Sequence, residues 1–168
     1  MFKFSNKKRK DNKGFSLVEL VIVIAILAIL VGILAPQYTK YVEKTRKAAD
    51  ASNMDEMVKV VKVYAADPAN ELAAGTYTII TDATETTVSN CPEGLTAELN
   101  ASIPNWTATT TKSKKWGANG EATSIIAYVK VNAEGGTSVT YATGDVATDT
   151  TKNKFAQYMS SGEAKAKN

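Results

Sequence analysis

The chain has 168 residues, of which 44% are hydrophobic and 22% charged, a composition that predicts one compact domain plus an anchoring segment and argues against extensive disorder. The net charge of +3 is uneven: residues 1–14 carry +5 and the remainder carries −2, so the basicity belongs to a short leader and indicates no nucleic-acid partner. The sequence has no histidine, which excludes histidine-dependent catalysis and histidine-ligated zinc. Its one cysteine, Cys91, cannot form an intrachain disulfide. We therefore expect no enzyme, no cofactor and no metal site.

An apolar segment follows the leader and runs from Phe15 to Ala35, interrupted by one charge at Glu19. Its twenty-one residues would span roughly 30 Å as a helix, at about 1.5 Å per residue, which is enough to cross a bilayer. The basic residues before the segment favour a cytoplasmic N-terminus. The sequence therefore predicts a membrane helix close to the N-terminus.

Two simpler explanations of this segment are incomplete. A secretory signal peptide would end in a small-x-small cleavage pattern, whereas this segment ends in Ile-Leu-Ala-Pro. A plain single-pass anchor explains the length but not Glu19, because a carboxylate near the end of an apolar run costs about 1–3 kcal/mol unless it is paired. Glu19 is therefore a candidate functional residue.

Residues 14–19, Gly-Phe-Ser-Leu-Val-Glu, resemble the type III signal of type IV prepilins. The resemblance implies that a membrane prepilin peptidase cleaves after Gly14 and methylates the new N-terminal amine, on Phe15. Glu19 becomes the fifth mature residue, where the family places its acidic residue. For overall organisation the chain is similar to major pilins of Gram-positive, clostridial type, whose bodies lack the closing disulfide.

The chemistry of these residues is consistent with that processing. Gly14 has no side chain, so an extended backbone can enter a protease site beside the membrane helix. Cleavage removes the leader 1–14 and leaves a charged amine next to an apolar helix. The spacing allows Glu19 to pair with the amine of its own helix, but the resemblance implies pairing with a neighbouring subunit, which would select register during assembly. Residues 15–35 are then the transmembrane and polymerisation half of the helix.

The apolar pattern changes after Pro36, and residues 36–66 form an amphipathic second half. Asp67-Pro68 terminates the pattern, so we predict one helix from Phe15 to Ala66. Gly32 and Pro36 predict a kink, because proline removes a helical hydrogen bond. The expected inward stripe consists of Tyr38, Tyr41, Val42, Thr45, Ala48, Ala49, Ser52, Val58, Val61 and Ala65. The expected i to i+4 ion pairs are Glu43 with Lys47 and Asp55 with Lys59.

Residues 67–168 form the extracellular body, which we expect to be mainly an antiparallel sheet. The predicted strands are Tyr77–Ile80, Ser124–Val131, Ser138–Ala142 and Trp106–Thr109, the second and third joined as a hairpin. Short helices are expected at Leu95–Ile103 and Phe155–Met159. The fold class is therefore α+β: a long helix, apolar then amphipathic, packed on an antiparallel sheet in a type IV pilin-like arrangement.

Two other features of the body have ordinary structural explanations. Cys91 is expected to be a buried small hydrophobe. Lys112, Lys114, Lys115 and Trp116 form a basic-aromatic patch, which we interpret as a solvated loop rather than a surface for DNA or a host.

The function implied by the resemblance is a structural type IV pilus subunit for adhesion, twitching motility or biofilm formation. The precursor would reside in the cytoplasmic membrane and the product in an extracellular fibre. Implied partners are other pilin subunits, prepilin peptidase, an inner-membrane assembly platform and a cytoplasmic assembly ATPase, since the chain has no phosphate-binding loop. Alternatives are a pseudopilin of a secretion or DNA-uptake machine and a simple membrane-anchored binding module, which predicts no processing at Gly14 and no need for Glu19.

Overall fold

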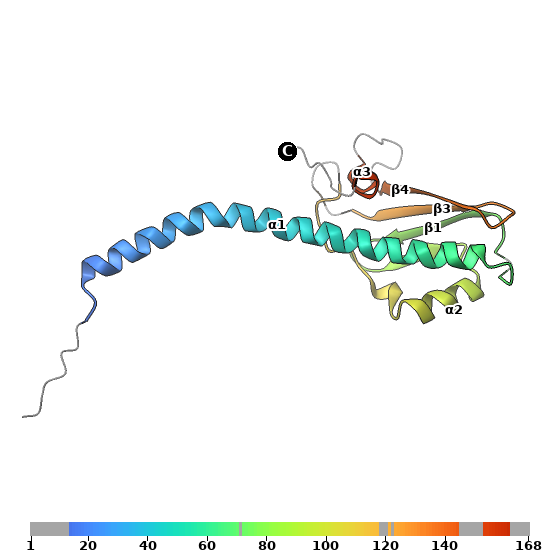
Figure 1. Ribbon diagram of the computed structural model, residues 1–168, viewed down its shortest axis with the longest axis horizontal. Helices are drawn as coiled ribbons and strands as arrows, with labels where there is room; N and C mark the ends of the chain where they lie inside the picture. The colour runs from blue at the N-terminus through green and yellow to red at the C-terminus, as the bar shows by residue number, and fades with distance from the viewer. Residues whose placement is uncertain (1–13, 71, 118–120, 122, 145–152, 162–168) are drawn as a thin grey trace, which may run out of the picture. The chain divides into compact units, whose positions relative to one another are not determined.

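The structure is a computed structural model that describes residues 14–70, 72–117, 121, 123–144 and 153–161 (Figure 1). It is an α+β fold in which a long, initially apolar N-terminal helix packs on a four-stranded antiparallel sheet. The elements in chain order are α1 (Leu17–Ala66), β1 (Gly75–Thr81), β2 (Thr86–Ser89), α2 (Glu93–Ser102), the 3-10 helix η1 (Trp106–Ala108), β3 (Ile125–Val131), β4 (Thr137–Thr143) and α3 (Lys154–Ser161). The chain divides into two compact units, Met1–Tyr41 and Val42–Asn168.

In the first unit, every described residue from Gly14 to Tyr41 is exposed. Helix α1 begins at Leu17, two residues later than expected. The helix continues through Pro36, whose carbonyl oxygen accepts a hydrogen bond from Thr39 Oγ1 at 3.0 Å. By length and composition this helix can cross a membrane. A kink at Gly32 and Pro36 stays a prediction.

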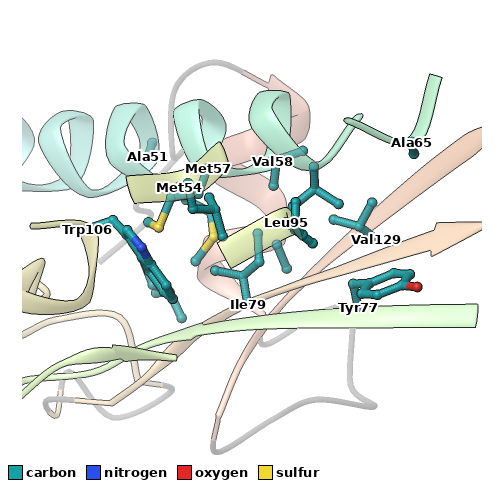
Figure 2. Packing of buried hydrophobic residues seen from close by; sticks show 14 of the residues in the cluster. Ala51, Met54, Met57, Val58, Ala65, Tyr77, Ile79, Leu95, Trp106 and Val129 are labelled. Atoms are coloured by element: carbon teal, nitrogen blue, oxygen red, sulfur yellow. The ribbon is translucent and has the colours of Figure 1, made fainter. Parts of the chain in front are cut away.

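In the second unit, the continuation of α1 supplies one wall of the core (Figure 2). The expected stripe is confirmed at Val58, Val61 and Ala65, which are buried. The stripe is wrong further towards the N-terminus, where Ala48, Ala49 and Ser52 are exposed. The residues of α1 that are buried are Lys47, Asp50, Ala51, Met54, Met57, Val58, Val61 and Ala65. This face is turned inward because Lys47 and Asp50 bind groups of the body, as described below.

The sheet has the strand order β2-β1-β3-β4, and all its neighbouring strands are antiparallel. The expected alternation in β3 is confirmed, since Ile125, Ala127, Val129 and Val131 are all buried. The predicted β3–β4 hairpin is also confirmed, with Val131 opposite Thr137 next to the turn.

The turn of this hairpin requires glycine at position 135. Gly135 has a φ of 77°, a left-handed value that side chains disfavour. A Cβ at this position would also lie 2.6 Å from the carbonyl oxygen of Ala65. The turn can therefore close against the end of α1 only with glycine there.

The remaining elements differ from the sequence prediction in two places, because β2 was not predicted and a strand predicted at residues 106–109 is absent from that described segment. The strand predicted at Tyr77–Ile80 lies within β1, and α2 and α3 confirm the two short helices. The strand predicted at Trp106–Thr109 is wrong, because the chain there forms η1. Asn105 turns the chain with a φ of 61°, and Trp106 Nε1 donates a 3.0 Å hydrogen bond to Asn100 Oδ1 at the end of α2.

Cys91 departs in part from the expectation of a buried small hydrophobe. It is half-buried, and its Sγ lies 3.2 Å from Thr96 Oγ1. The thiol therefore contacts a polar group beside the core as well as the apolar side chains of the core.

Candidate processing and assembly site

The start of α1 is held by a reciprocal pair of hydrogen bonds between Ser16 and Glu19. The Ser16 backbone N–H donates to Glu19 Oε2 at 2.9 Å, and the Glu19 backbone N–H donates to Ser16 Oγ at 3.2 Å. This arrangement is a capping box, in which two otherwise unpaired donors at a helix start are satisfied. The box makes Ser16 the N-cap and Leu17 the first helical residue, which explains why the helix does not begin at Phe15.

The peptide bond between Gly14 and Phe15 consequently lies outside the helix. Both residues are exposed and belong to neither a helix nor a strand. Among the described residues beyond its chain neighbours, no atom lies within 4 Å of the position that a Cβ of residue 14 would take. An accessible, non-helical backbone is the form in which proteases bind their substrates, so this bond is open to cleavage.

Ser16 is the residue at this site that the sequence interpretation missed. Its signal was present, because Ser-x-x-Glu before an apolar run is the pattern of a capping box. The box also places the carboxylate of Glu19 at the positive end of the helix dipole, which stabilises a negative charge. Glu19 therefore has a local structural role in addition to any role between subunits.

A continuous apolar surface follows directly after the capping box. The large hydrophobic side chains between Leu17 and Leu34 are 48–79% exposed, and Phe15 is 88% exposed. From Leu20 to Ala35 the sequence has no charged residue, which makes Glu19 the only charge within this surface. Such a surface is unstable in water and requires lipid or other apolar helices.

The candidate residues do not form one cluster. Gly14, Phe15 and Glu19 lie together at the start of α1, whereas Gly32 and Pro36 are 13 and 17 residues beyond Glu19. At about 1.5 Å per residue these distances are roughly 20 and 26 Å along the helix. Gly32 and Pro36 can thus affect the course of the helix but not the chemistry at its start.

A second polar cluster lies where α1 enters the body and is centred on Asp50, which is 2% exposed. Its Oδ1 accepts a hydrogen bond from the Lys112 N–H at 2.6 Å, and its Oδ2 accepts from the Ser113 N–H at 2.9 Å and from Trp116 Nε1 at 2.8 Å. A buried carboxylate that receives three donors is well compensated for its lost hydration. Asp50 therefore ties the segment 112–116 to the helix.

Lys47 and Glu43 complete this cluster in an unexpected way. The Lys47 ammonium lies over the Trp116 ring, 5.0 Å from its centroid, and burial lowers the pKa of this lysine. Glu43 Oε1 accepts a hydrogen bond from Ser113 Oγ. Both members of the predicted Glu43–Lys47 pair thus also contact the body, and Glu43 still acts electrostatically to raise the pKa of Lys47 against the larger effect of burial. The predicted Asp55–Lys59 ion pair is confirmed at 2.7 Å.

The described residues contain no group of three or more acidic, cysteine or histidine side chains that could hold a metal ion. What the described chain offers chemically is therefore an accessible peptide bond, a capped helix start with one carboxylate, and an apolar helix surface.

Comparison with known proteins agrees with this description of the N-terminus. Residues 9–35 match the family model of the prokaryotic N-terminal methylation motif. No curated protein and no solved structure matches the chain. The motif is typical of type IV pilins and pseudopilins, and it implies processing by a prepilin peptidase and assembly into a pilus-like machine. The motif and the fold together are those of a type IV pilin-like or pseudopilin protein whose precursor is anchored in a membrane.

Proposed function

We propose that the chain is a structural subunit of a type IV pilus. In this proposal, prepilin peptidase cleaves the precursor after Gly14 and methylates the amine of Phe15. The mature subunit then leaves the cytoplasmic membrane and polymerises through its N-terminal helix into an extracellular fibre. Such a fibre would serve adhesion, twitching motility or biofilm formation.

The observation that carries this proposal is the exposed apolar helix with one carboxylate at its start. Every residue from 14 to 41 is exposed. A surface of this kind is stable in lipid before assembly and in a bundle of identical helices afterwards. The same surface can therefore serve first as an anchor and then as the polymer interface.

Glu19 gives this interface a preferred register. One carboxylate oxygen, Oε2, already accepts from the Ser16 N–H, whereas Oε1 accepts no hydrogen bond from the described residues. In an apolar bundle this oxygen favours a cation, and cleavage creates one in the amine of Phe15. Neighbouring subunits that align amine with carboxylate avoid leaving an unpaired charge in the bundle.

In this proposal, assembly also requires other proteins. The proposed partners are prepilin peptidase, an inner-membrane assembly platform, and a cytoplasmic ATPase that supplies the force. The closer similarity to major pilins of Gram-positive, clostridial type stays a prediction, supported by a single cysteine that cannot form an intrachain disulfide.

The test is the mass of the N-terminal peptide of protein sheared from intact cells. We expect a peptide that begins at Phe15 and is about 14 Da heavier than the unmodified peptide. The variant Gly14→Val should remain in the membrane with Met1 at its N-terminus, because a branched side chain would then flank the scissile bond. Gly32→Val is the matched control, since this glycine also has open space around it and lies outside the cleavage site.

Electron microscopy of the sheared material then separates the two pilin-like functions. Long fibres support the pilus subunit, whereas a processed and methylated chain that forms only short assemblies supports a pseudopilin. A chain that begins at Met1 in wild-type cells contradicts both and leaves a membrane-anchored binding module.

A further inference from the structure

We propose that Ser16 is a positioning residue for cleavage, because its capping box with Glu19 holds the peptide bond between Gly14 and Phe15 outside the helix. This inference rests on the proposed function, in which prepilin peptidase hydrolyses that bond. The bond between the Gly14 carbonyl carbon and the Phe15 nitrogen breaks, and water supplies the hydroxyl to the carbon and the proton to the nitrogen. Ser16 takes no part in these bond changes, so its role is to present the bond in a form that the peptidase can bind.

Ser16 fixes the start of α1 through three of its polar groups. Its backbone N–H donates to Glu19 Oε2 at 2.9 Å, and its Oγ accepts from the Glu19 N–H at 3.2 Å. Its carbonyl oxygen accepts from the Leu20 N–H at 3.1 Å, as expected of an N-cap residue. The peptide unit that joins Phe15 to Ser16 is therefore the last one in the box, and the unit that joins Gly14 to Phe15 lies just outside it.

The capping box competes directly with a helix that continues over the scissile bond. In such a helix the Glu19 N–H would donate to the carbonyl oxygen of Phe15, four residues earlier. In the structure this N–H donates to the Ser16 hydroxyl instead. The side chain of Ser16 therefore takes a donor that a longer helix would need.

The surroundings of a membrane helix favour that longer helix once the cap is lost. Backbone groups without a partner are costly next to lipid, and continuation of the helix satisfies them. Gly14 opposes continuation by only roughly two- to fivefold relative to alanine, whereas loss of an N-cap changes the stability of a helix start roughly 2- to 30-fold. Ser16 is therefore at least as strong a determinant of the helix start as Gly14.

The bond between Gly32 and Ile33 shares other local features of the site. Both Gly14 and Gly32 have open space around them, and each precedes a large apolar side chain that is more than half exposed. Gly32 and Ile33, however, lie inside α1, where the backbone is helical. A non-helical backbone is thus a local feature that separates the two bonds, and Ser16 provides it at the first.

The test is the rate at which prepilin peptidase cleaves the full-length precursor in detergent micelles, followed by mass spectrometry. We expect Ser16→Ala to be cleaved at least about threefold more slowly than wild type, because loss of the cap lets the helix extend over the bond. Ser16→Asn should restore a rate close to that of wild type, because a carboxamide oxygen caps a helix as well as a hydroxyl does. Since asparagine lacks the hydroxyl, this rescue separates capping from direct recognition of serine by the peptidase.

Glu19 provides a second pair of variants and a structural measurement. Glu19→Ala removes the acceptor of the Ser16 N–H and should slow cleavage, whereas Glu19→Gln retains an acceptor and should be cleaved normally. The carbon-13 chemical shifts of Gly14 and Phe15 in the same micelles report the conformation of their backbone. We expect helical values in the two alanine variants and non-helical values in the other two. Fluorescence of the buried Trp116 checks that the body is folded in each variant.

Three results would overturn the inference. The first is a wild-type cleavage rate in Ser16→Ala, which would leave the proposed function intact. The second is a slow rate that Ser16→Asn does not restore, and the third is a slow rate without a change in the shifts of Gly14 and Phe15, since the hydroxyl would then act by contact with the peptidase. A wild-type precursor that is not cleaved after Gly14 contradicts the proposed function itself, and this inference fails with it.

Discussion

Glu19 has a role within its own helix, and the proposed function gives it a second, separable role between subunits. The capping box needs only a side chain that accepts a hydrogen bond from the Ser16 N–H, and glutamine can do this as well as glutamate. Pairing with an amine needs the negative charge. Substitution by glutamine should therefore retain the first role and remove the second.

We predict that Glu19→Gln is processed normally but yields at least about tenfold fewer fibres, because the apolar bundle then lacks its charge pair. The measurements are the N-terminal mass and the quantity of sheared fibre. Ser16→Thr is the control that retains both the cap and the charge. Wild-type fibre yield from Glu19→Gln would contradict the charge-pair mechanism.

Asp50 joins α1 to the segment 112–116 through three hydrogen bonds. We predict that Asp50→Asn lowers the free energy of unfolding by about 2–3 kcal/mol, because the amide turns a donor towards at least one of the three buried donors. Urea unfolding of the detergent-solubilised chain, followed by fluorescence of the buried Trp116, measures the change.

Asp55→Asn is the matched control for Asp50→Asn. It changes the same group on the same helix, but Asp55 pairs with Lys59 at the surface, where a salt bridge contributes little because both charges stay solvated. Equal losses from both variants would show that the Asp50 cluster adds no special stability.

These residues also mark what the sequence could and could not predict. Ser16 is predictable, since the capping pattern is local, although the motif was interpreted as a signal for processing and assembly and not as a helix cap. The inward face at Lys47 and Asp50 was not predictable from periodicity, because their partners lie more than sixty residues later in the chain. A charged residue on a helix is ordinarily predicted to face solvent. Lys47 and Asp50 face inward because they contact the loop that contains Trp116.

At the scale of elements, the local sequence pattern is sufficient to predict a helix or hairpin whose contacting residues are also close in the sequence. The β3–β4 hairpin followed from alternation on both sides of a Gly-Gly turn. The threonine-rich segment at Trp106 has the composition of a strand but forms η1, because a left-handed Asn105 and the bond from Trp106 to Asn100 bend it back onto α2. Tertiary contacts there override strand propensity.

The hydrogen bonds of the β1–β2 turn make a contribution to stability that depends on pH. Asp82 Oδ1 accepts hydrogen bonds from Thr84 Oγ1 at 2.6 Å, from the Thr84 N–H at 2.7 Å and from the Glu85 N–H at 2.9 Å. These bonds, led by the Thr84 hydroxyl, lower the pKa of Asp82 below its ordinary value of 3.8. The carboxylate therefore stabilises the fold above that value, and the contribution is lost as the pH falls through the folded-state pKa.

We predict that Asp82→Ala destabilises the protein at pH 5 to 7 and that its difference from wild type shrinks below about pH 3.8. Thermal unfolding across this pH range is the measurement. Glu85→Ala controls for loss of a carboxylate from the same turn. A difference that stays constant down to pH 2 would assign the effect of Asp82→Ala to packing instead of ionised hydrogen bonding.

At the scale of the whole molecule, the apolar helix and the core belong to different units. The core cluster begins at Ala51 and includes no residue of the unit Met1–Tyr41. The same chain thus contains one part that is stable in water and one that is stable only in lipid or in a helical bundle. The proposed function needs this division, because in that proposal the body remains folded while the helix passes from the membrane into the fibre.

This division predicts that a fragment of residues 42–168 folds as a soluble monomer without detergent. The fragment retains the whole core cluster and the Asp50 contacts and loses the exposed apolar surface of the first unit. Sedimentation should show a monomer, and near-ultraviolet circular dichroism should show the ordered Trp116. Asp50→Asn in the fragment should cost the same free energy as in the full chain, since its partners are all present. A fragment that aggregates or lacks fixed aromatic signals would show that the first unit contributes to folding of the body as well as to anchoring.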